Sequence, residues 1–417
     1  MTFSVWLIFF RIIAWSSCIG KTFHLILSER ITTFVTENRY VKNEIQKAFL
    51  PGINGVVEHN IVMDEIIKDA KEKKKTVHIS FYDLEDAFGS VPHNLIFDTL
   101  ERNNFPTQIS EYIKLLYQNT SAIVNTKKFK SNIFSFKRGV IQGDPLSPII
   151  FLMTFNPIIE YLEKEQERFG YSLNGTKIIS LPYADDFCSI TTNMRSHQKI
   201  MNEINRKIET MGMRLKPIKC RTFSIRSGTP TLIHFKIKEN KIPSIAEEEQ
   251  KFLGKVISFS GKSIDNYNLI KENFTKQLKN LDNTKIRNEY KLWIYKNYFL
   301  PSKRFLLTVH ELTSSYLKML DTQTFQFVKK WAGLPKCASN TIFTTNVALD
   351  IPSITQLYTE THCLNHATTR IKGDKIVNQA LNSKLQRESN CKRNKSVAIG
   401  VEEFYNSHSD KENQKKQ

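Results

Sequence analysis

Alternating apolar and polar residues at 76–83 form the clearest strand pattern of the chain, with Val77, Ile79 and Phe81 on one face. A period of two is typical of a β-strand, because successive side chains point to opposite faces of a sheet. Two short apolar runs, at 178–181 and 187–190, flank a Pro-Tyr-Ala-Asp-Asp segment and predict a β-hairpin. Further strands are expected at 121–125, at 133–137, around Leu215 and at 223–225.

Longer segments have apolar residues three and four positions apart, which predicts amphipathic helices. These helices are expected at 19–39, 56–75, 93–103, 107–118, from Ser147 onward, and at 197–211. In the first of them, Phe23, Ile26, Leu27 and Ile31 are expected to share the buried face. Ser147 before Pro148 is typical of an N-cap followed by proline at the first helical position.

The chain changes character after about residue 262, where helical patterns rich in Lys, Asn and Tyr follow one another. Near the end of this part, Gly333 and Pro335 are typical of a helix stop. The apolar stripe that they end consists of Leu317, Leu320, Thr324, Phe327, Val328 and Trp331. From about 380 the sequence is polar and has no hydrophobic pattern, which predicts disorder.

Composition narrows the class of protein. The 417 residues are 40% hydrophobic, and 60 Lys and Arg against 41 Asp and Glu give a formal charge of +19. This excess favours a polyanionic partner, nucleic acid first and an anionic membrane second, with mere solubility as the alternative. Six cysteines without a CxxC pair predict a reducing compartment. His362, Cys363 and His366 form a weak zinc candidate, and ordinary helical residues are the favoured interpretation.

The N-terminus carries an apolar run from Val5 to Phe10 that Arg11 interrupts. The run is far shorter than the ~20 residues that span a bilayer. No Lys or Arg precedes Arg11, so the basic start of a signal peptide is missing. A buried strand is therefore expected, with an export or anchor signal as the alternative.

Three carboxylates are the candidate chemistry: Asp83 at a strand end, and Asp185 and Asp186 at the hairpin tip. In one antiparallel sheet these positions can lie side by side, where carboxylates repel one another unless cations lie between them. Mg²⁺ prefers carboxylate and phosphate oxygens, and two such ions can hold the attacking and leaving oxygens of a phosphoryl transfer. An ordinary turn is the alternative for Asp-Asp alone.

The order of three sequence blocks favours the metal site over an ordinary turn. The blocks are FYDLEDAFGSVPH (81–93), GVIQGDPLSP (139–148) and LPYADDF (181–187). Together they resemble palm motifs A, B and C of reverse transcriptases, and their wording is similar to that of non-LTR, LINE-type retrotransposon enzymes. The resemblance covers about residues 10–380. It includes fingers blocks at 10–31 and 46–60, motif D at 211–225, motif E at 251–258, and thumb blocks at 288–305 and 327–335.

The resemblance implies an α+β right-hand polymerase, with an antiparallel palm sheet backed by helices in a ferredoxin- or RRM-like core. The expected domains are partial fingers at 1–60, palm at 61–260, helical thumb at 261–380 and a basic, disordered tail at 381–417. The implied activity is that of an RNA-directed DNA polymerase, which extends a primer 3′-OH with dNTPs on an RNA template, as in target-primed retrotransposition.

The resemblance also implies roles for single residues. Asp83, Asp185 and Asp186 match the carboxylates that hold two Mg²⁺ ions, which Mn²⁺ can replace. The residues that match the nucleotide site are Arg11, Leu84, whose carbonyl is also a metal ligand, Asp86, Ala87, Phe88, Gln142 and Gly143. Phe88 matches a steric gate against a 2′-hydroxyl, with a core residue as the alternative. Lys219 matches a catalytic proton donor, with a solvated lysine as the alternative.

Nucleic-acid contacts are implied as well. Phe252, Leu253 and Gly254 match the primer grip, with plain strand packing as the alternative. Lys318, Lys329 and Lys330 lie off the apolar stripe of the thumb and are candidates to hold the template–primer duplex, or else are solvated lysines. The expected partners are an RNA template, a DNA primer or target and dNTPs, without a membrane, inside the cell in nucleus and cytoplasm.

The sequence departs from the family pattern in several places. Ile12 stands where Pro is usual, Lys216 where Asn is frequent, and only ten residues precede Arg11. No Cys/His knuckle or restriction-like acidic cluster follows the thumb, so we expect the polymerase piece of a longer element, without its endonuclease. Two alternatives stay open: a nucleic-acid-binding remnant without catalysis, and an RNA-directed RNA polymerase, against which Phe88 argues.

Overall fold

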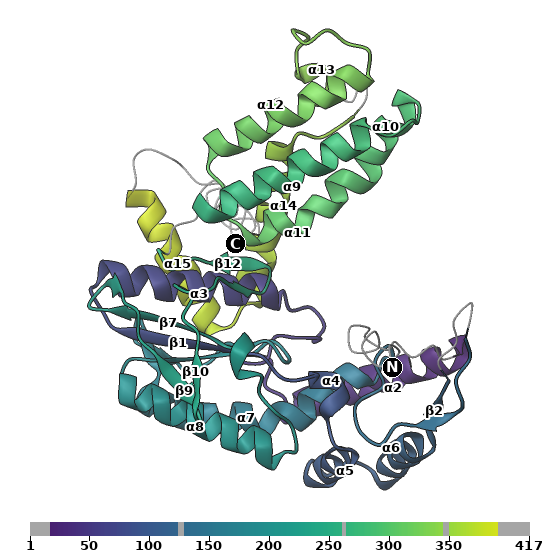
Figure 1. The fold of residues 1–417 in the computed structure, drawn as a ribbon, viewed down its shortest axis with the longest axis vertical. Helices are drawn as coiled ribbons and strands as arrows, with labels where there is room; N and C mark the ends of the chain where they lie inside the picture. The colour runs from purple at the N-terminus through teal and green to yellow at the C-terminus, as the bar shows by residue number, and fades with distance from the viewer. Residues whose placement is uncertain (1–16, 124–128, 261–263, 345–349, 391–417) are drawn as a thin grey trace, which may run out of the picture. The chain divides into compact units, whose positions relative to one another are not determined.

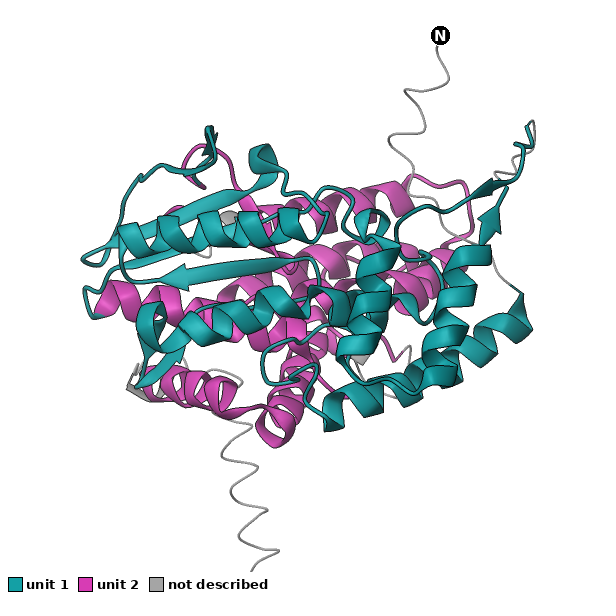
Figure 2. Cartoon of the chain, turned by 90° about the horizontal axis from the view of Figure 1, so that it is seen from below, with its two compact units in different colours: residues 1–51, 73–244 teal, residues 52–72, 245–417 magenta. Residues whose placement is uncertain are grey.

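The computed structural model describes residues 17–123, 129–260, 264–344 and 350–390. The chain forms two compact units, coloured separately in Figure 2. Unit 1 consists of residues 1–51 and 73–244, and unit 2 of residues 52–72 and 245–417. The chain therefore leaves unit 1 after residue 51, contributes residues 52–72 to unit 2, and returns to unit 1 at residue 73. The predicted boundaries at 60 and 260 do not coincide with these limits, and the division into fingers, palm and thumb stays a prediction.

Unit 1 is built around a four-stranded antiparallel sheet with strand order β6-β1-β7-β8. These strands are β1 (Val77–Tyr82), β6 (Phe187–Thr191), β7 (Arg221–Arg226) and β8 (Thr229–Pro230). All six residues of the central strand β1 are buried. Its polar face is covered too, so the alternation in the sequence does not mark a solvent-exposed side: His78 and Ser80 are buried.

The helices of unit 1 confirm the periodic pattern of the sequence. In Figure 1, α7 (Ser147–Phe169) and α8 (Met194–Thr210) lie along one side of this sheet. The remaining elements are α2 (Cys18–Glu37), α4 (Ala87–Ser90), α5 (His93–Arg102), α6 (Thr107–Asn119), β2 (Ser121–Ala122), β3 (Phe134–Ser135), β4 (Tyr171–Leu173), β5 (Thr176–Ile178), the 3-10 turn η1 (Pro217–Lys219), β9 (Phe235–Ile237) and β10 (Asn240–Ile242). Two N-terminal predictions, the strand at Val5–Phe10 and the role of Arg11, lie outside the described residues.

Two details of the predicted helices are wrong. In α2, Leu27 and Ile31 are buried as expected, but Phe23 and Ile26 are each 51% exposed. The buried face instead includes His24, because this side chain has a buried partner described below. At the start of α7, Leu146 is the N-cap and Ser147 is already helical. The Ser147 hydroxyl donates to the carbonyl of Ile141 at 2.7 Å rather than capping the helix.

Unit 2 is helical apart from one hairpin, β11 (Gln250–Phe252) and β12 (Lys255–Ile257). Its helices are α3 (Gly55–Glu72), α9 (Ile264–Asp282), α10 (Asn288–Ile294), the π-helical turn η2 (Tyr295–Phe299), α11 (Leu300–Val309), α12 (Ser314–Trp331), α13 (Thr341–Thr344), α14 (Ile354–Lys372) and α15 (Lys375–Asn390). The predicted stripe of α12 is confirmed: Leu317, Leu320 and Val328 enter the hydrophobic core of this unit. Within the described part of the chain, no helix is both long and apolar enough to cross a membrane.

The prediction of disorder from residue 381 is wrong for residues 381–390, which belong to α15. This helix packs on α3 and buries Val377, Ala380 and Leu381. Arg387 pairs with Glu65 of α3, and Lys384 lies 2.7 Å from Glu311. The few apolar residues of α15 form no visible stripe, and its charges find their partners far away in sequence. Residues 391–417 lie outside the described part.

Candidate active site

Two of the three predicted carboxylates lie at the end of the central strand pair. The register pairs Tyr82 of β1 with Phe187 of β6. Asp83 directly follows this last pair and Asp186 directly precedes it, so continuing the register by one step would set the two aspartates opposite each other, where Cβ atoms are about 4.5–5.5 Å apart. Asp83 and Asp185 are half-buried and Asp186 is exposed. The predicted hairpin around these aspartates is confirmed.

The hairpin tip is a tight turn that a buried glutamine supports. Tyr183 and Asp186 exchange both backbone hydrogen bonds, at 2.8 and 3.0 Å. Between them, Ala184 has a φ of +55°, a left-handed conformation that costs an L-residue about 1–2 kcal/mol. The Gln46 side-chain oxygen accepts hydrogen bonds from the backbone nitrogens of Ala184 and Ala48, both at 3.0 Å. Gln46 therefore holds the aspartate turn in a strained conformation.

The backbone after β1 is attached to the segment that follows α8. Lys216 donates its backbone N–H to the carbonyl of Asp83 at 2.8 Å, and Glu85 donates to Arg214 at 2.9 Å. The carbonyl of Leu84 accepts no hydrogen bond from the described residues, which suits its expected role as a ligand. Beneath this turn, burial raises the pKa of the Cys220 thiol to about 11, so this cysteine is a neutral neighbour of Asp83.

The carboxylate oxygens themselves are not gathered into a metal centre. Among the described residues, no three His, Cys, Asp or Glu side chains form a group that could hold a metal ion. The structure thus brings the backbone of Asp83 and Asp186 together, and the convergence of their oxygens with Asp185 stays a prediction. The donor set fits Mg²⁺, which prefers carboxylate and carbonyl oxygens.

Phe88 lies on the short helix α4, directly beside the second sequence block. Its half-buried ring stacks on Phe151 of α7 with centroids 4.6 Å apart, and meets Phe49 edge-on at 6.3 Å. The Phe88 carbonyl accepts a hydrogen bond from Val140 at 2.8 Å. This approach requires glycine at 139, where φ is +92° and a Cβ would lie 2.8 Å from the backbone of Gly89. The first and second blocks therefore run side by side.

The other predicted nucleotide-site residues surround this contact. Asp86 has a left-handed φ of +48° and precedes α4, whose first residue Ala87 is buried. Gln142 is half-buried and Gly143 is exposed, both in the loop before α7. The structure thus places these residues within one region of unit 1, and their contacts with a nucleotide stay predictions.

A buried Asp–His–Tyr chain supports the second block, and our sequence analysis missed it. His24 of α2 bonds to Asp144 through Nδ1 and to the Tyr112 hydroxyl through Nε2 at 2.6 Å. Asp144 also accepts the backbone N–H of Leu146 at 2.8 Å. The three residues connect α2 and α6 to the loop that carries Gln142 and Gly143. Asp144 belongs to the block GVIQGDPLSP (139–148). Its partner His24 lies 120 residues away, and no pattern in the sequence around His24 indicates the contact.

The remaining candidates belong to other elements of the chain. Lys219 is exposed on η1 of unit 1. Leu253 and Gly254 form the turn of the β11–β12 hairpin in unit 2, with φ of +45° and +87°. Phe252 and Leu253 are buried, and a Cβ at Gly254 would lie 2.7 Å from the Phe305 ring. This packing accounts for the three residues without a primer, and the primer grip stays a prediction.

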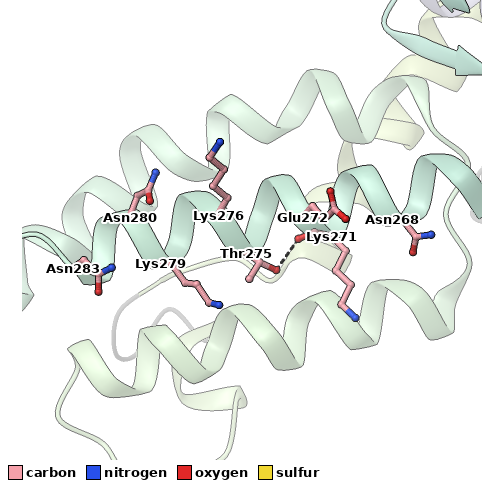
Figure 3. Close-up of a pocket in the computed structure, with 8 residues that line it drawn as sticks. All are labelled: Asn268, Lys271, Glu272, Thr275, Lys276, Lys279, Asn280 and Asn283. Atoms are coloured by element: carbon pink, nitrogen blue, oxygen red, sulfur yellow. Dashed lines mark hydrogen bonds between the residues drawn. The ribbon is translucent and has the colours of Figure 1, made fainter. Parts of the chain in front are cut away.

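The lysines of two helices in unit 2, α12 and α9, differ in their contacts. On α12, Lys330 pairs with Asp282 at 2.8 Å and Lys329 donates to the Lys336 carbonyl at 3.2 Å, whereas Lys318 is exposed. The exposed face of α9 instead borders an open hollow of about 700 Å³. Figure 3 shows Lys271 and Lys279 on one side of this helix and Lys276 on the other. No carboxylate of the described chain pairs with these three lysines.

The weak zinc candidate on α14 finds no support. The His362 Nε2 donates to the Leu307 carbonyl at 2.9 Å, and burial lowers the pKa of His362 to about 4. Cys363 and His366 belong to no metal-binding group among the described residues.

Fold and site together define the palm of a nucleotidyl-transferring polymerase: an antiparallel sheet backed by helices, with acidic residues at the ends of its central strands. The family model described as reverse transcriptase (RNA-dependent DNA polymerase) matches residues 9–257, more than half of the chain. The chain belongs to the reverse transcriptase family.

Curated relatives agree with this family. The chain is 26% identical to the retrovirus-related Pol polyprotein from type-1 retrotransposable element R2 of Nasonia vitripennis, over 78% of this chain and 31% of the relative. It is 25% identical to the polyprotein of the same name from Bradysia coprophila, over 78% of this chain and 37% of the relative. The chain thus spans about a third of the length of these relatives. The expected likeness to non-LTR retrotransposon enzymes is confirmed.

Among solved structures, telomerase from Candida tropicalis in complex with a fragment of telomeric RNA aligns with 93% of this chain and 56% of its own. The TM-score is 0.44 and the sequence identity 13%.

Proposed function

We propose that this chain extends the 3′-hydroxyl of a primer with dNTPs copied from an RNA template, as one part of target-primed retrotransposition inside the cell. One observation supports the proposal: the paired strands end at Tyr82 and Phe187, directly next to Asp83 and Asp186, in a chain of the reverse transcriptase family. RNA template, DNA primer and dNTPs are the proposed partners.

Asp83, Asp185, Asp186 and the Leu84 carbonyl would hold the metal ions. Bound there, two Mg²⁺ ions would neutralise charge on the attacking and leaving oxygens of the phosphoryl transfer. The protein contributes positioning: hydrogen bonds from Gln46 fix the aspartate turn, and backbone bonds to Arg214 and Lys216 fix the strand end. An exposed Lys219 is free of described partners and would donate a proton to the leaving pyrophosphate.

The incoming nucleotide would lie against Phe88. Its ring is stacked on Phe151 and its carbonyl is bonded to Val140, so the ring is held in place and would exclude a 2′-hydroxyl. Asp86, Ala87, Gln142 and Gly143 would contact the nucleotide from the adjoining loops. We keep Arg11 as the proposed triphosphate contact and 252–254 as the proposed primer grip, from the family resemblance alone.

The test is primer extension by the purified chain with Mg²⁺, on RNA and DNA templates, with dNTPs or NTPs. The proposal predicts products on RNA with dNTPs that EDTA abolishes. Equal use of NTPs would favour an RNA-directed RNA polymerase. Salt-dependent template binding without any extension would favour a binding remnant.

A further inference from the structure

A basic pocket lies in unit 1, at the end of β1 that is opposite to Asp83. It has a volume of about 470 Å³. Its polar lining residues are Thr76, His78, Thr192, Asn193, Arg195 and Arg226. His78 lies five positions before Asp83, which corresponds to about 16 Å along the strand. None of the residues assigned to the nucleotide site lines this pocket.

The two arginines of the pocket come from different elements and lack a counter-charge. Arg195 lies in the first turn of α8 and Arg226 ends β7. Both are exposed, and neither forms an ion pair with any residue of the described ranges. None of the residues that line the pocket is Asp or Glu. The lining therefore concentrates positive charge without a carboxylate of its own.

A buried histidine supplies a further polar group. His78 is 2% exposed, its Nδ1 lies 2.9 Å from the Ser224 hydroxyl, and its ring packs edge-on against Phe235. Burial and the charge of Arg226 lower the pKa of His78 to about 4, so the ring is neutral at pH 7. In the tautomer in which Ser224 donates to Nδ1, Nε2 carries the proton. Nε2 has no partner among the described residues, so it is available to an acceptor oxygen.

The start of α8 strengthens the field in the pocket. The positive end of a helix dipole favours an anion nearby. The first main-chain donors are taken, because the Asn193 side-chain oxygen accepts from Arg195 at 2.9 Å and Ser196 at 3.2 Å. A ligand would therefore be bound by side chains: two guanidinium groups, the imidazole and the hydroxyls of Thr76 and Thr192.

We propose that this pocket binds a phosphate group, and that a nucleic-acid strand outside the catalytic site carries it. Guanidinium groups match phosphate oxygens in a bidentate geometry. The open volume exceeds that of one phosphate ion, which favours a phosphate on a continuous strand. This site does not depend on nucleotidyl transfer, so primer extension on a short template tests the proposed function separately.

The experiment compares two double variants of the full chain that lose equal charge. The pocket variant is Arg195→Gln with Arg226→Gln. The control is Arg102→Gln with Arg206→Gln, two exposed arginines outside the pocket. Binding of a fluorescently labelled, unstructured RNA is measured by anisotropy over a series of KCl concentrations. Loss of two phosphate contacts should flatten the logarithmic salt slope by about 1.4, while the control keeps the wild-type slope. Arg195→Gln alone should give about half that change.

A second arm separates a strand from a free ion. Line broadening of inorganic phosphate in ³¹P NMR should occur with the wild type and be lost with the pocket variant. A change in phosphate broadening without a change in the RNA slope would identify a free phosphate as the ligand. If the pocket variant matches the control in both arms, the pocket binds no phosphate and the proposal is overturned.

Discussion

The aspartate turns of unit 1 and the contact between α3 and α15 in unit 2 use charged residues in opposite ways. In unit 1, Asp83, Asp185 and Asp186 lie half-buried or exposed in turns, where the backbone fixes their positions. In unit 2, Glu65 is 1% exposed and pairs with Arg387. This pair, with its glutamate buried, holds α15 to α3, whereas the aspartates of unit 1 have half-buried or exposed side chains.

A network around α11 extends this contrast. Lys384 holds the pKa of Glu311 well below its usual range, and Lys68 adds to the effect. Asp64 pairs with Lys255 in the same unit. Glu65, Glu311 and Asp64 of unit 2 are thus neutralised by lysine or arginine from distant segments. The three aspartates of unit 1 instead lie at half-buried or exposed positions that suit cations. Burial and partner, rather than residue type, separate a structural carboxylate from a candidate catalytic one.

The largest effect on stability is expected from breaking the buried pair of unit 2. Arg387→Ala leaves the Glu65 carboxylate buried, with Lys68 at 3.8 Å as its remaining ion-pair partner among the described residues. Removing one partner of a buried pair costs about 3 kcal/mol. The free energy of unfolding, measured with urea, should fall by that amount. Replacing both residues, Glu65→Leu with Arg387→Met, should restore much of it.

The control for this experiment is the exposed pair of unit 1, Glu203 and Arg206, at 2.8 Å. Arg206→Ala should leave the unfolding midpoint unchanged, because exposed pairs contribute little. Equal losses from Arg387→Ala and Arg206→Ala would contradict the contrast between the units.

A second effect on stability, which depends on pH and reaches its full size only in acid, is expected from His362 in unit 2. Burial lowers the pKa of His362 to about 4, below the value of about 6.5 in an unfolded chain. The unfolded state therefore binds more protons in this window, and stability falls as the pH drops from 6.5 to 4. The contribution reaches up to about 3 kcal/mol.

His362→Gln should remove this share of the pH dependence, measured as urea unfolding at pH 7, 5.5 and 4. His234→Gln, at an exposed position in unit 1, is the control and should leave the profile unchanged. An unaltered profile in His362→Gln would mean that this histidine does not stay neutral in the fold.

A still smaller effect concerns nucleotide choice in unit 1. Phe88→Val should reduce discrimination against ribonucleotides by about tenfold, because the smaller side chain leaves room for a 2′-hydroxyl. Competition between dNTPs and NTPs in primer extension measures it. Phe169→Val, at the opposite end of α7 from Phe151, is the control and should keep the discrimination. Unchanged discrimination in Phe88→Val would make Phe88 a core residue.

The smallest effect tests how unit 2 contacts nucleic acid. The lysines of α9 lack carboxylate partners, whereas two of the three on α12 have partners already. Changing Lys271, Lys276 and Lys279 to Gln should flatten the salt slope of template–primer binding by about 2. Changing Lys318, Lys329 and Lys330 to Gln should alter it less. A larger change in salt slope for the α12 variant than for the α9 variant would mean that α12 holds the template–primer duplex.

Local patterns predicted much of the fold. The strand β1 and the helices α5, α6 and α8 lie within a few residues of their predicted ranges, because hydrophobic period is a local property of the chain. The ordered motifs also predicted Asp83 and the aspartate turn. Long-range partners were out of reach: Gln46 supports Ala184, 138 residues away, and Glu65 and Arg387 meet from opposite ends of the chain. The sequence of α15 has no hydrophobic periodicity that would indicate this contact, so its residues from about 380 were predicted to be disordered.

The central claim is that Asp83 and Asp186, from strands a hundred residues apart, act as one catalytic site. A double-mutant cycle in primer extension on RNA tests it, with Asp83→Asn, Asp186→Asn and the double variant, and with exposed Asp98→Asn as the control. Each single change should lower the rate about a hundredfold or more. The double variant should be no slower than the worse single variant, because residues that act as a unit are not additive. Penalties that multiply, or a single variant that keeps the wild-type rate, would contradict the account.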